Sequence, residues 1–202
     1  MSKSENPLRQ LSEFGQSVWL DYIRRHLLTS PEFQRMLTED GLRGMTSNPT
    51  IFEKAIAGST DYDDQLQELA PGNKSVDEIA EALTIADIRM AADALRPLYD
   101  QSGAKFGFVS YEVSPLLGND TEATIFAARR YADASGRPNV MIKVPATPEG
   151  IPAIEQLISE GRNINITLMF SMKHYEAVAE AYIRGLERRA KAGQPVDRIA
   201  SV

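Results

Sequence analysis

Short runs of apolar and β-branched residues alternate along this chain with longer segments of helical period. The short runs predict strands, and they cover residues 17–23, 44–48, 107–113, 140–145, 163–170 and 198–202. The longer segments predict helices, and they cover residues 50–69, 75–101, 120–134, 148–160 and 171–192. Because helical segments separate successive strands, the order predicts parallel strands that are covered by helices.

Helix boundary signals support this division. The segment "SVDE" that begins at Ser75 has the Ser-x-x-Glu pattern of a capping box. Gly161 and Gly193 follow the last periodic residues of their segments. Glycine is favoured there because it adopts a left-handed backbone without steric cost.

Polar side chains share one face of several predicted strands. In "GFVSYEV", Ser110 and Glu112 alternate with Val109 and Tyr111. The runs around residues 21, 143 and 165 alternate in the same way. The centre of a doubly wound sheet is apolar on both faces, whereas the interior of a (β/α)₈ TIM barrel holds polar groups near its active site. The fold class we predict is therefore α/β, a TIM barrel of the class I aldolase type. An antiparallel sheet with a wet outer face fits less well, because long crossovers separate the strands.

A complete barrel has eight strands and about 250 residues, whereas this chain has 202 residues and six candidate strands. We therefore expect one barrel domain over residues 1–202 that is truncated before the last strands. The last run ends at Val202 without a terminating signal, which predicts the N-terminal part of a longer protein.

Composition narrows the functional classes. The net charge of −6 and a pI near 5.1 argue against nucleic acid or an anionic membrane as the main partner. The chain has no cysteine, which excludes disulfides and thiolate chemistry. The polar N-terminus lacks the pattern of a signal peptide, so we expect a cytoplasmic protein.

Lys143 is the one lysine of seven with two apolar residues on each side. It is either an edge or snorkelling lysine, or a desolvated amine that attacks a carbonyl to form a Schiff base. The local pattern leaves both readings open.

Two acids favour the catalytic reading. Asp21 and Glu112 lie near the ends of two other strands, on the polar parity. Carboxyl groups there can supply the proton transfers that carbinolamine formation and carbon–carbon cleavage need. Each acid alone could instead pair with an arginine.

The amides of Asn48 and Asn165 could hold polyol hydroxyls, and Thr167 could orient a water beside Glu112. Asn48 precedes a proline, however, which by itself marks a turn and a helix start. His26 and His174 are isolated, and the chain has no glycine-rich nucleotide loop, so neither a metal nor a nucleotide cofactor is predicted.

The ordered motifs "SVWLDYI", "RGMTSNPTIFEKAI", "FVSYEVSP", "VMIKVPATPEGIPAIEQL" and "NINITLMFS" resemble those of transaldolases. The resemblance covers nearly the whole chain and is closest to the longer bacterial type, which also occurs fused to glucose-6-phosphate isomerase.

The resemblance implies a cofactor-free enzyme of the pentose phosphate pathway, monomeric or homodimeric at full length. Such enzymes move a dihydroxyacetone unit from sedoheptulose 7-phosphate or fructose 6-phosphate to an aldose phosphate. By motif match, Lys143 is the Schiff-base lysine and Asp21 the acid/base for cleavage. Glu112 acts through a water held by Thr167, and Asn48 and Asn165 bind the dihydroxyacetone hydroxyls. The family's phosphate-binding arginines correspond to positions after Val202.

Two alternatives remain open at this stage. The chain is an inactive fragment or an interaction module that needs a partner, or it is an enzyme similar to fructose-6-phosphate aldolase that uses no acceptor sugar.

Overall fold

A computed structural model describes residues 6–202 of the chain, which divide into two compact units. Unit 1 extends to Val109, and unit 2 runs from Ser110 to Val202. Five strands occur in the described part, and their order in the sheet follows their order along the chain, β1-β2-β3-β4-β5. Strand β3 (Phe108–Glu112) crosses the boundary between the units. No helix among the described residues is both long and apolar enough to cross a membrane.

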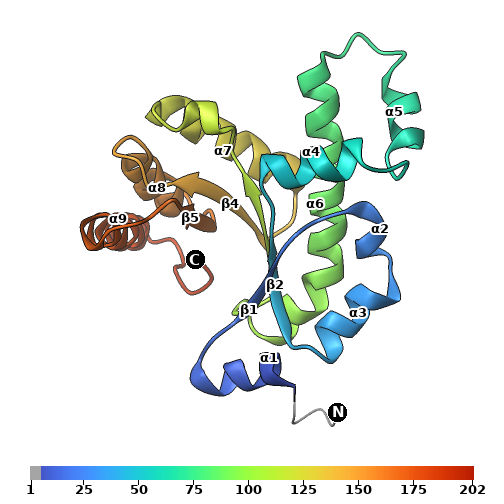
Figure 1. The fold of residues 1–202 in the computed structure, drawn as a ribbon. Helices are drawn as coiled ribbons and strands as arrows, with labels where there is room; N and C mark the ends of the chain where they lie inside the picture. The colour runs from blue at the N-terminus through green and yellow to red at the C-terminus, as the bar shows by residue number, and fades with distance from the viewer. Residues whose placement is uncertain (1–5) are drawn as a thin grey trace. The chain divides into compact units, whose positions relative to one another are not determined.

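Unit 1 contains strands β1 (Val18–Asp21) and β2 (Leu42–Thr46), which pair in parallel. Its helices are α1 (Pro7–Gln10), α2 (Arg25–Leu28), α3 (Pro31–Thr38), α4 (Pro49–Ala57), α5 (Asp63–Leu69) and α6 (Val76–Gln101), with a 3₁₀ turn η1 (Leu11–Phe14). The long helix α6 contacts α2, α5 and β2 (Figure 1).

Trp19 packs directly on the backbone of the neighbouring strand. It lies opposite Gly44 in the β1–β2 register. A β-carbon on Gly44 would overlap the Trp19 ring, so only glycine fits beneath this indole.

Unit 2 contains the end of β3, strands β4 (Val140–Pro145) and β5 (Ile164–Thr167), and three long helices. The helices are α7 (Thr121–Ser135), α8 (Gly150–Ser159) and α9 (Met172–Lys191), and a 3₁₀ turn η2 (Pro115–Leu117) precedes them. Strands β4 and β5 pair in parallel. Helix α8 packs between α7 and α9 (Figure 1).

Several helix ends form as the sequence predicts. Ser75 Oγ accepts from Glu78 N at 3.2 Å, and Ser75 N donates to Glu78 Oε2 at 2.7 Å, which completes the capping box of α6. Gly161 and Gly193 both have left-handed backbones, with φ of 87° and 70°. The helical pattern of apolar residues therefore ends at the point where the backbone adopts a left-handed conformation.

Other elements differ from the prediction. The helix predicted over residues 50–69 is interrupted, because α4 ends at Ala57, with Gly58 as its C-cap, and the chain turns before α5 begins. The short helices between β1 and β2 were not predicted. The sixth strand, predicted over residues 198–202, is reduced to a single parallel bridge between Ser201 and Ile164.

Candidate active site

Lys143 lies in the middle of a buried strand. Its neighbours Ile142 and Val144 are 1% and 0% exposed, and the lysine side chain is only 14% exposed. Strand β4 is bonded on both sides, since it pairs with β5 and Lys143 O accepts from Val113 N at 3.2 Å. The reading of Lys143 as a solvated edge lysine is therefore wrong.

Glu112 supplies the charge that compensates this lysine. Its Oε2 atom lies 3.2 Å from Lys143 Nζ, and its side chain is 16% exposed. Although Oε2 is within ion-pair distance, it is buried and accepts no hydrogen bond of good geometry from the described residues. Buried ion pairs are weak evidence for stability, because desolvation offsets their attraction. An ammonium and a carboxylate in contact can, however, exchange a proton.

Asn165 stands beside Lys143 in the β4–β5 register. Its Nδ2 group donates to Ser110 Oγ at 2.9 Å, and Ser110 is fully buried. Thr167 lies opposite Pro145, two residues further toward the carboxyl ends of the two strands. Unit 2 thus brings Lys143, Glu112 and Asn165 together, and Thr167 lies two residues further along β5.

The two remaining candidates, Asp21 and Asn48, belong to unit 1. Asp21 is the exposed last residue of β1 and lies opposite Thr46. Asn48 is the N-cap of α4, because its Oδ1 accepts from Ile51 N at 2.9 Å. Asn48 therefore marks a helix start, as its position before a proline predicted, and it uses its Oδ1 atom for this cap. Its Nδ2 group makes no hydrogen bond to any residue the structure describes.

Two polar residues near the candidates were not among the predicted site residues. Ser110 orients Asn165, and Thr46 has a buried hydroxyl without a hydrogen-bond partner among the described residues. Each precedes a predicted site residue by two positions, Glu112 and Asn48 respectively. In an extended segment such spacing places both side chains on one face, which is the signal that could have found them.

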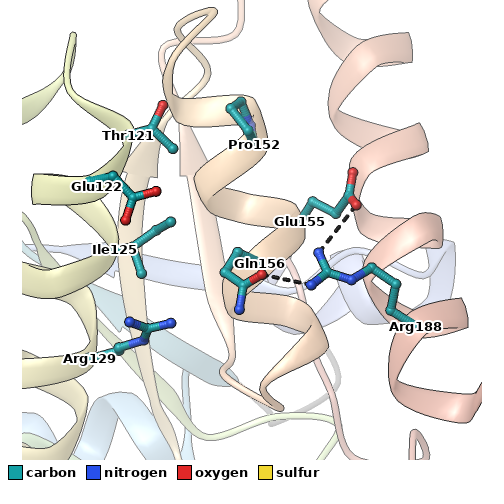
Figure 2. Close-up of a pocket in the computed structure, with 8 residues that line it drawn as sticks. All are labelled: Thr121, Glu122, Ile125, Arg129, Pro152, Glu155, Gln156 and Arg188. Carbon is teal, nitrogen blue, oxygen red and sulfur yellow. Dashed lines mark hydrogen bonds and ion pairs between the residues drawn. The ribbon is translucent and has the colours of Figure 1, made fainter. Parts of the chain in front are cut away.

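A polar cavity of about 330 Å³ lies elsewhere in unit 2 (Figure 2). It is lined by residues of helices α7, α8 and α9: Thr121, Glu122, Ile125, Arg129, Pro152, Glu155, Gln156 and Arg188. Arg188 Nη2 donates to Gln156 Oε1 at 2.7 Å, and Arg184 lowers the pKa of Glu155 through a 2.7 Å hydrogen bond. Two arginines and two glutamates balance the lining charge, so the cavity offers no net charge to an ionic ligand.

Comparison with known proteins decides the family. The model that describes transaldolase/fructose-6-phosphate aldolase matches residues 18–202. This chain belongs to the transaldolase family. The match also confirms the fold class, an α/β chain of parallel strands that corresponds to an incomplete TIM barrel.

Curated transaldolases are similar over almost the whole chain. Transaldolase 2 of Nostoc punctiforme is 48% identical over 199 residues, which are 98% of this chain and 52% of that protein. Transaldolase of Thermobifida fusca is 46% identical over 197 residues, which are 98% of this chain and 54% of that protein. Transaldolase 1 of Streptomyces avermitilis is 45% identical over 202 residues, which are 53% of that protein. The chain thus spans about half the length of the transaldolases it matches.

Proposed function

We propose that this chain carries the Schiff-base machinery of a transaldolase that transfers a dihydroxyacetone unit from a ketose phosphate to an aldose phosphate. The donor is sedoheptulose 7-phosphate or fructose 6-phosphate. The observation that carries the proposal is the contact between Lys143 and Glu112 within buried strands. A buried amine with a carboxylate proton acceptor at 3.2 Å has the parts needed to form an imine.

In the proposed reaction Lys143 first gives a proton to Glu112, and its neutral amine then attacks the C2 carbonyl of the ketose. The resulting carbinolamine takes a proton from Glu112, through a water held by Thr167, and its hydroxyl leaves as water. The product is a protonated Schiff base on Lys143. Its positive charge draws electrons from the neighbouring carbon–carbon bond.

Cleavage requires a base at the C4 hydroxyl, and we assign this role to Asp21. As Asp21 removes the hydroxyl proton, the C3–C4 bond breaks and its electrons enter the imine to give an enamine. The aldose phosphate leaves. The enamine carbon then attacks the aldehyde of the acceptor, Asp21 returns the proton, and hydrolysis of the new imine releases the product ketose.

Asn48 and Asn165 are proposed to hold the dihydroxyacetone hydroxyls. Each amide uses one atom within the protein: Asn48 accepts from Ile51, and Asn165 donates to Ser110. Asn48 Nδ2 and Asn165 Oδ1 are then the atoms offered to substrate. Side chains and one water supply every proton transfer in this scheme, so it needs no cofactor. A single barrel domain, a cytoplasmic location and a role in the pentose phosphate pathway belong to the same proposal.

Borohydride trapping tests the assignment of Lys143. The chain is incubated with fructose 6-phosphate or dihydroxyacetone and borohydride, and the adduct is located by peptide mass mapping. Reduction accumulates the imine irreversibly, so it detects imine formation even where turnover is slow. We expect the adduct on Lys143 in excess of that on Lys191, a lysine whose side chain is 79% exposed. An adduct distribution that follows lysine exposure would refute the proposal.

Two variants sharpen this test. Lys143→Met should remove the preferential adduct while Lys191→Met leaves it unchanged. Glu112→Gln keeps the lysine but removes the proton acceptor, so we expect labelling to slow by about 10²-fold. An unchanged labelling rate in Glu112→Gln would assign the proton transfers to another group.

A fructose-6-phosphate aldolase activity is the second candidate, because the matching family model covers both enzymes. Such an enzyme would release free dihydroxyacetone without an acceptor. Assays with fructose 6-phosphate in the presence and absence of erythrose 4-phosphate separate the two activities. Transfer that depends on erythrose 4-phosphate supports the transaldolase.

A further inference from the structure

The hydroxyl of Thr46 is a buried polar group that the proposed reaction leaves without a role. Thr46 is the last residue of β2, and its Oγ1 atom is buried without a hydrogen-bond partner among the residues that the structure describes. A buried donor of this kind has lost its bond to water and has gained none in return. Since buried polar groups are nearly always hydrogen-bonded, we looked for a group that could accept from Thr46.

Asp21 occupies the position next to Thr46 in the sheet. The two residues are partners in the parallel β1–β2 register, so their side chains point to the same face. Neighbouring strands lie about 4.7–4.9 Å apart, a separation that rotation of the Asp21 side chain can bridge to bring an oxygen to the hydroxyl. Asp21 is exposed, and its side chain makes no ion pair or hydrogen bond within the described part of the chain. A donor and an acceptor, both unused, therefore stand side by side.

The arginines that follow Asp21 are already bound to other acids. Arg24 Nε donates to Asp61 Oδ2 at 2.9 Å, and Arg25 Nε donates to Asp87 Oδ1 at 2.8 Å. The alternative that Asp21 merely pairs with an arginine is therefore not realised among residues 6–202. The Asp21 carboxylate remains available to accept from a neutral donor.

We propose that Thr46 is a positioning residue for Asp21. In the substrate complex the Thr46 hydroxyl donates to one carboxylate oxygen, and the other oxygen faces the C4 hydroxyl of the bound ketose. That oxygen takes the hydroxyl proton, the C3–C4 bond breaks to release the aldehyde, and the bonding electrons enter the imine. The inference rests on the role proposed above for Asp21 and adds a residue that no step of that scheme uses.

The expected effect is confined to one step of the reaction. Imine formation uses Lys143 and Glu112, whereas only cleavage uses Asp21. Proton transfer needs the carboxylate oxygen within about 2.6–3.2 Å of the hydroxyl, and an unanchored side chain rotates among several staggered conformations. Loss of the Thr46 hydroxyl should therefore slow cleavage and leave imine formation unchanged.

Mass analysis of trapped adducts measures the two steps separately. The 202-residue chain is incubated with fructose 6-phosphate and borohydride, so the Lys143 peptide carries a six-carbon phosphorylated adduct before cleavage and a three-carbon adduct after it. In Thr46→Val, which keeps the shape of the side chain, we expect the ratio of three-carbon to six-carbon adduct to fall about tenfold or more. Labelling of Lys143 by dihydroxyacetone, which needs no cleavage, should stay the same. Thr46→Ser keeps a hydroxyl and should restore most of the ratio.

Further variants connect the effect to Asp21 and exclude a general one. Thr46→Val should cause no additional loss in a protein that already carries Asp21→Asn, because its effect acts through that carboxylate. Thr84→Val is the matched control, since Thr84 is 8% exposed and its hydroxyl donates to Ala80 O at 3.0 Å within α6. Its adduct ratio should equal that of the wild type. Circular dichroism checks the fold of each variant, and Thr46→Ala removes the same hydroxyl if Thr46→Val does not fold.

Four outcomes would overturn the inference. They are an unchanged adduct ratio in Thr46→Val, an additional loss in the Asp21→Asn background, weaker labelling of Thr46→Val by dihydroxyacetone, and a wild-type chain that yields only the six-carbon adduct. In each case a preferential adduct on wild-type Lys143 would still support the proposed Schiff-base chemistry. A wild-type chain without that adduct would instead contradict the proposed function itself.

Discussion

Asp87 is a carboxylate with no exposed surface in the middle of helix α6. Its Oδ1 lies 2.8 Å from Arg25 Nε, and its Oδ2 accepts from the Tyr62 hydroxyl at 2.6 Å. The Arg25 guanidinium also stacks over the Tyr62 ring at 4.5 Å. Burial, followed by the bond to Asp87, raises the pKa of Tyr62, so the phenol remains protonated and continues to donate. These three side chains tie α2 and the start of α5 to α6.

We expect Asp87→Ala to lower the free energy of unfolding by about 3–5 kcal/mol, because it leaves Arg25 buried without its counter-charge. Urea unfolding followed by the fluorescence of Trp19 measures the change. Asp100→Ala in the same helix is the control. Its carboxylate is 55% exposed in an ion pair with Arg96, so the expected change is within about 0.5 kcal/mol. Similar losses in both variants would contradict this reading of the network.

The sequence reveals charged groups in strands more readily than hydroxyl groups. Lys143 and Glu112 were predictable, because a charge in an apolar strand needs a partner. Ser110 and Thr46 share a strand face with Glu112 and Asn48, but this spacing alone does not reveal their roles, because hydroxyl residues are common in strands and their partners lie on neighbouring strands. Asp87 carried no signal either. Helical periodicity places a residue on a face, but it does not reveal that Arg25 and Tyr62 meet it there.

At the scale of elements, helices α8 and α9 approach closely at Gly185. A β-carbon at this position would lie 2.8 Å from Glu155 O and 2.8 Å from Ile158 Cβ. We expect Gly185→Ala to lower the free energy of unfolding by about 1–2 kcal/mol. Overpacking costs about 1–3 kcal/mol, and the better helix propensity of alanine returns up to about 1 kcal/mol.

Circular dichroism in urea measures this effect. Gly72→Ala is the control, because its β-carbon would meet only ordinary contacts, the nearest at 3.4 Å from Leu69 O. A change within about 0.5 kcal/mol is expected there. An equally small change in Gly185→Ala would show that α8 and α9 move apart without cost.

Ion pairs also join the helices of unit 2. Arg129 in α7 pairs with Glu160 at the end of α8, and Arg184 in α9 pairs with Glu155 at 2.7 Å. These hydrogen bonds hold the pKa values of Glu160 and Glu155 below the ordinary 4.5. Their stabilisation is therefore present above pH 4.5 and is lost as the pH falls through the lowered folded-state values.

The double variant Glu155→Gln/Glu160→Gln tests this dependence. Its deficit in free energy of unfolding relative to the wild type should be largest near pH 6–7 and shrink between about pH 5 and pH 2. Thermal or urea unfolding across this range provides the measurement. Glu187→Gln is the control, because this carboxylate is 59% exposed in its ion pair with Lys191 and its loss should change the free energy of unfolding by no more than about 0.5 kcal/mol. If the deficit in free energy of unfolding did not change with pH, it would come from lost packing and not from the ion pairs.

Element prediction succeeded where several turns repeat one pattern. Helices α6, α7, α8 and α9 lie within a few residues of their predicted bounds. The helices α2 and α3 were missed because segments of 4 and 8 residues give too few turns for a periodic signal. The strand predicted at residues 198–202 was overestimated. Within the described residues this segment forms one parallel bridge, at Ser201, and Val202 N donates to Ile164 O at 3.2 Å.

At the scale of the whole molecule, the chain spans about half the length of its relatives. We expect the isolated 202-residue chain to transfer dihydroxyacetone far more slowly than a full-length relative, because it corresponds to only about half of such a protein. An assay with fructose 6-phosphate and erythrose 4-phosphate measures the rate. A rate similar to that of the full-length enzyme would contradict the expectation.

The packing of Trp19 on Gly44 has a practical consequence. Trp19 is the sole tryptophan of the sequence, and it belongs to unit 1. Its emission is therefore a built-in optical reporter of one unit only, whereas circular dichroism averages over both. If the two signals melt at one temperature, the units unfold cooperatively. If the emission changes at a different temperature, the order of unfolding can be read without any label.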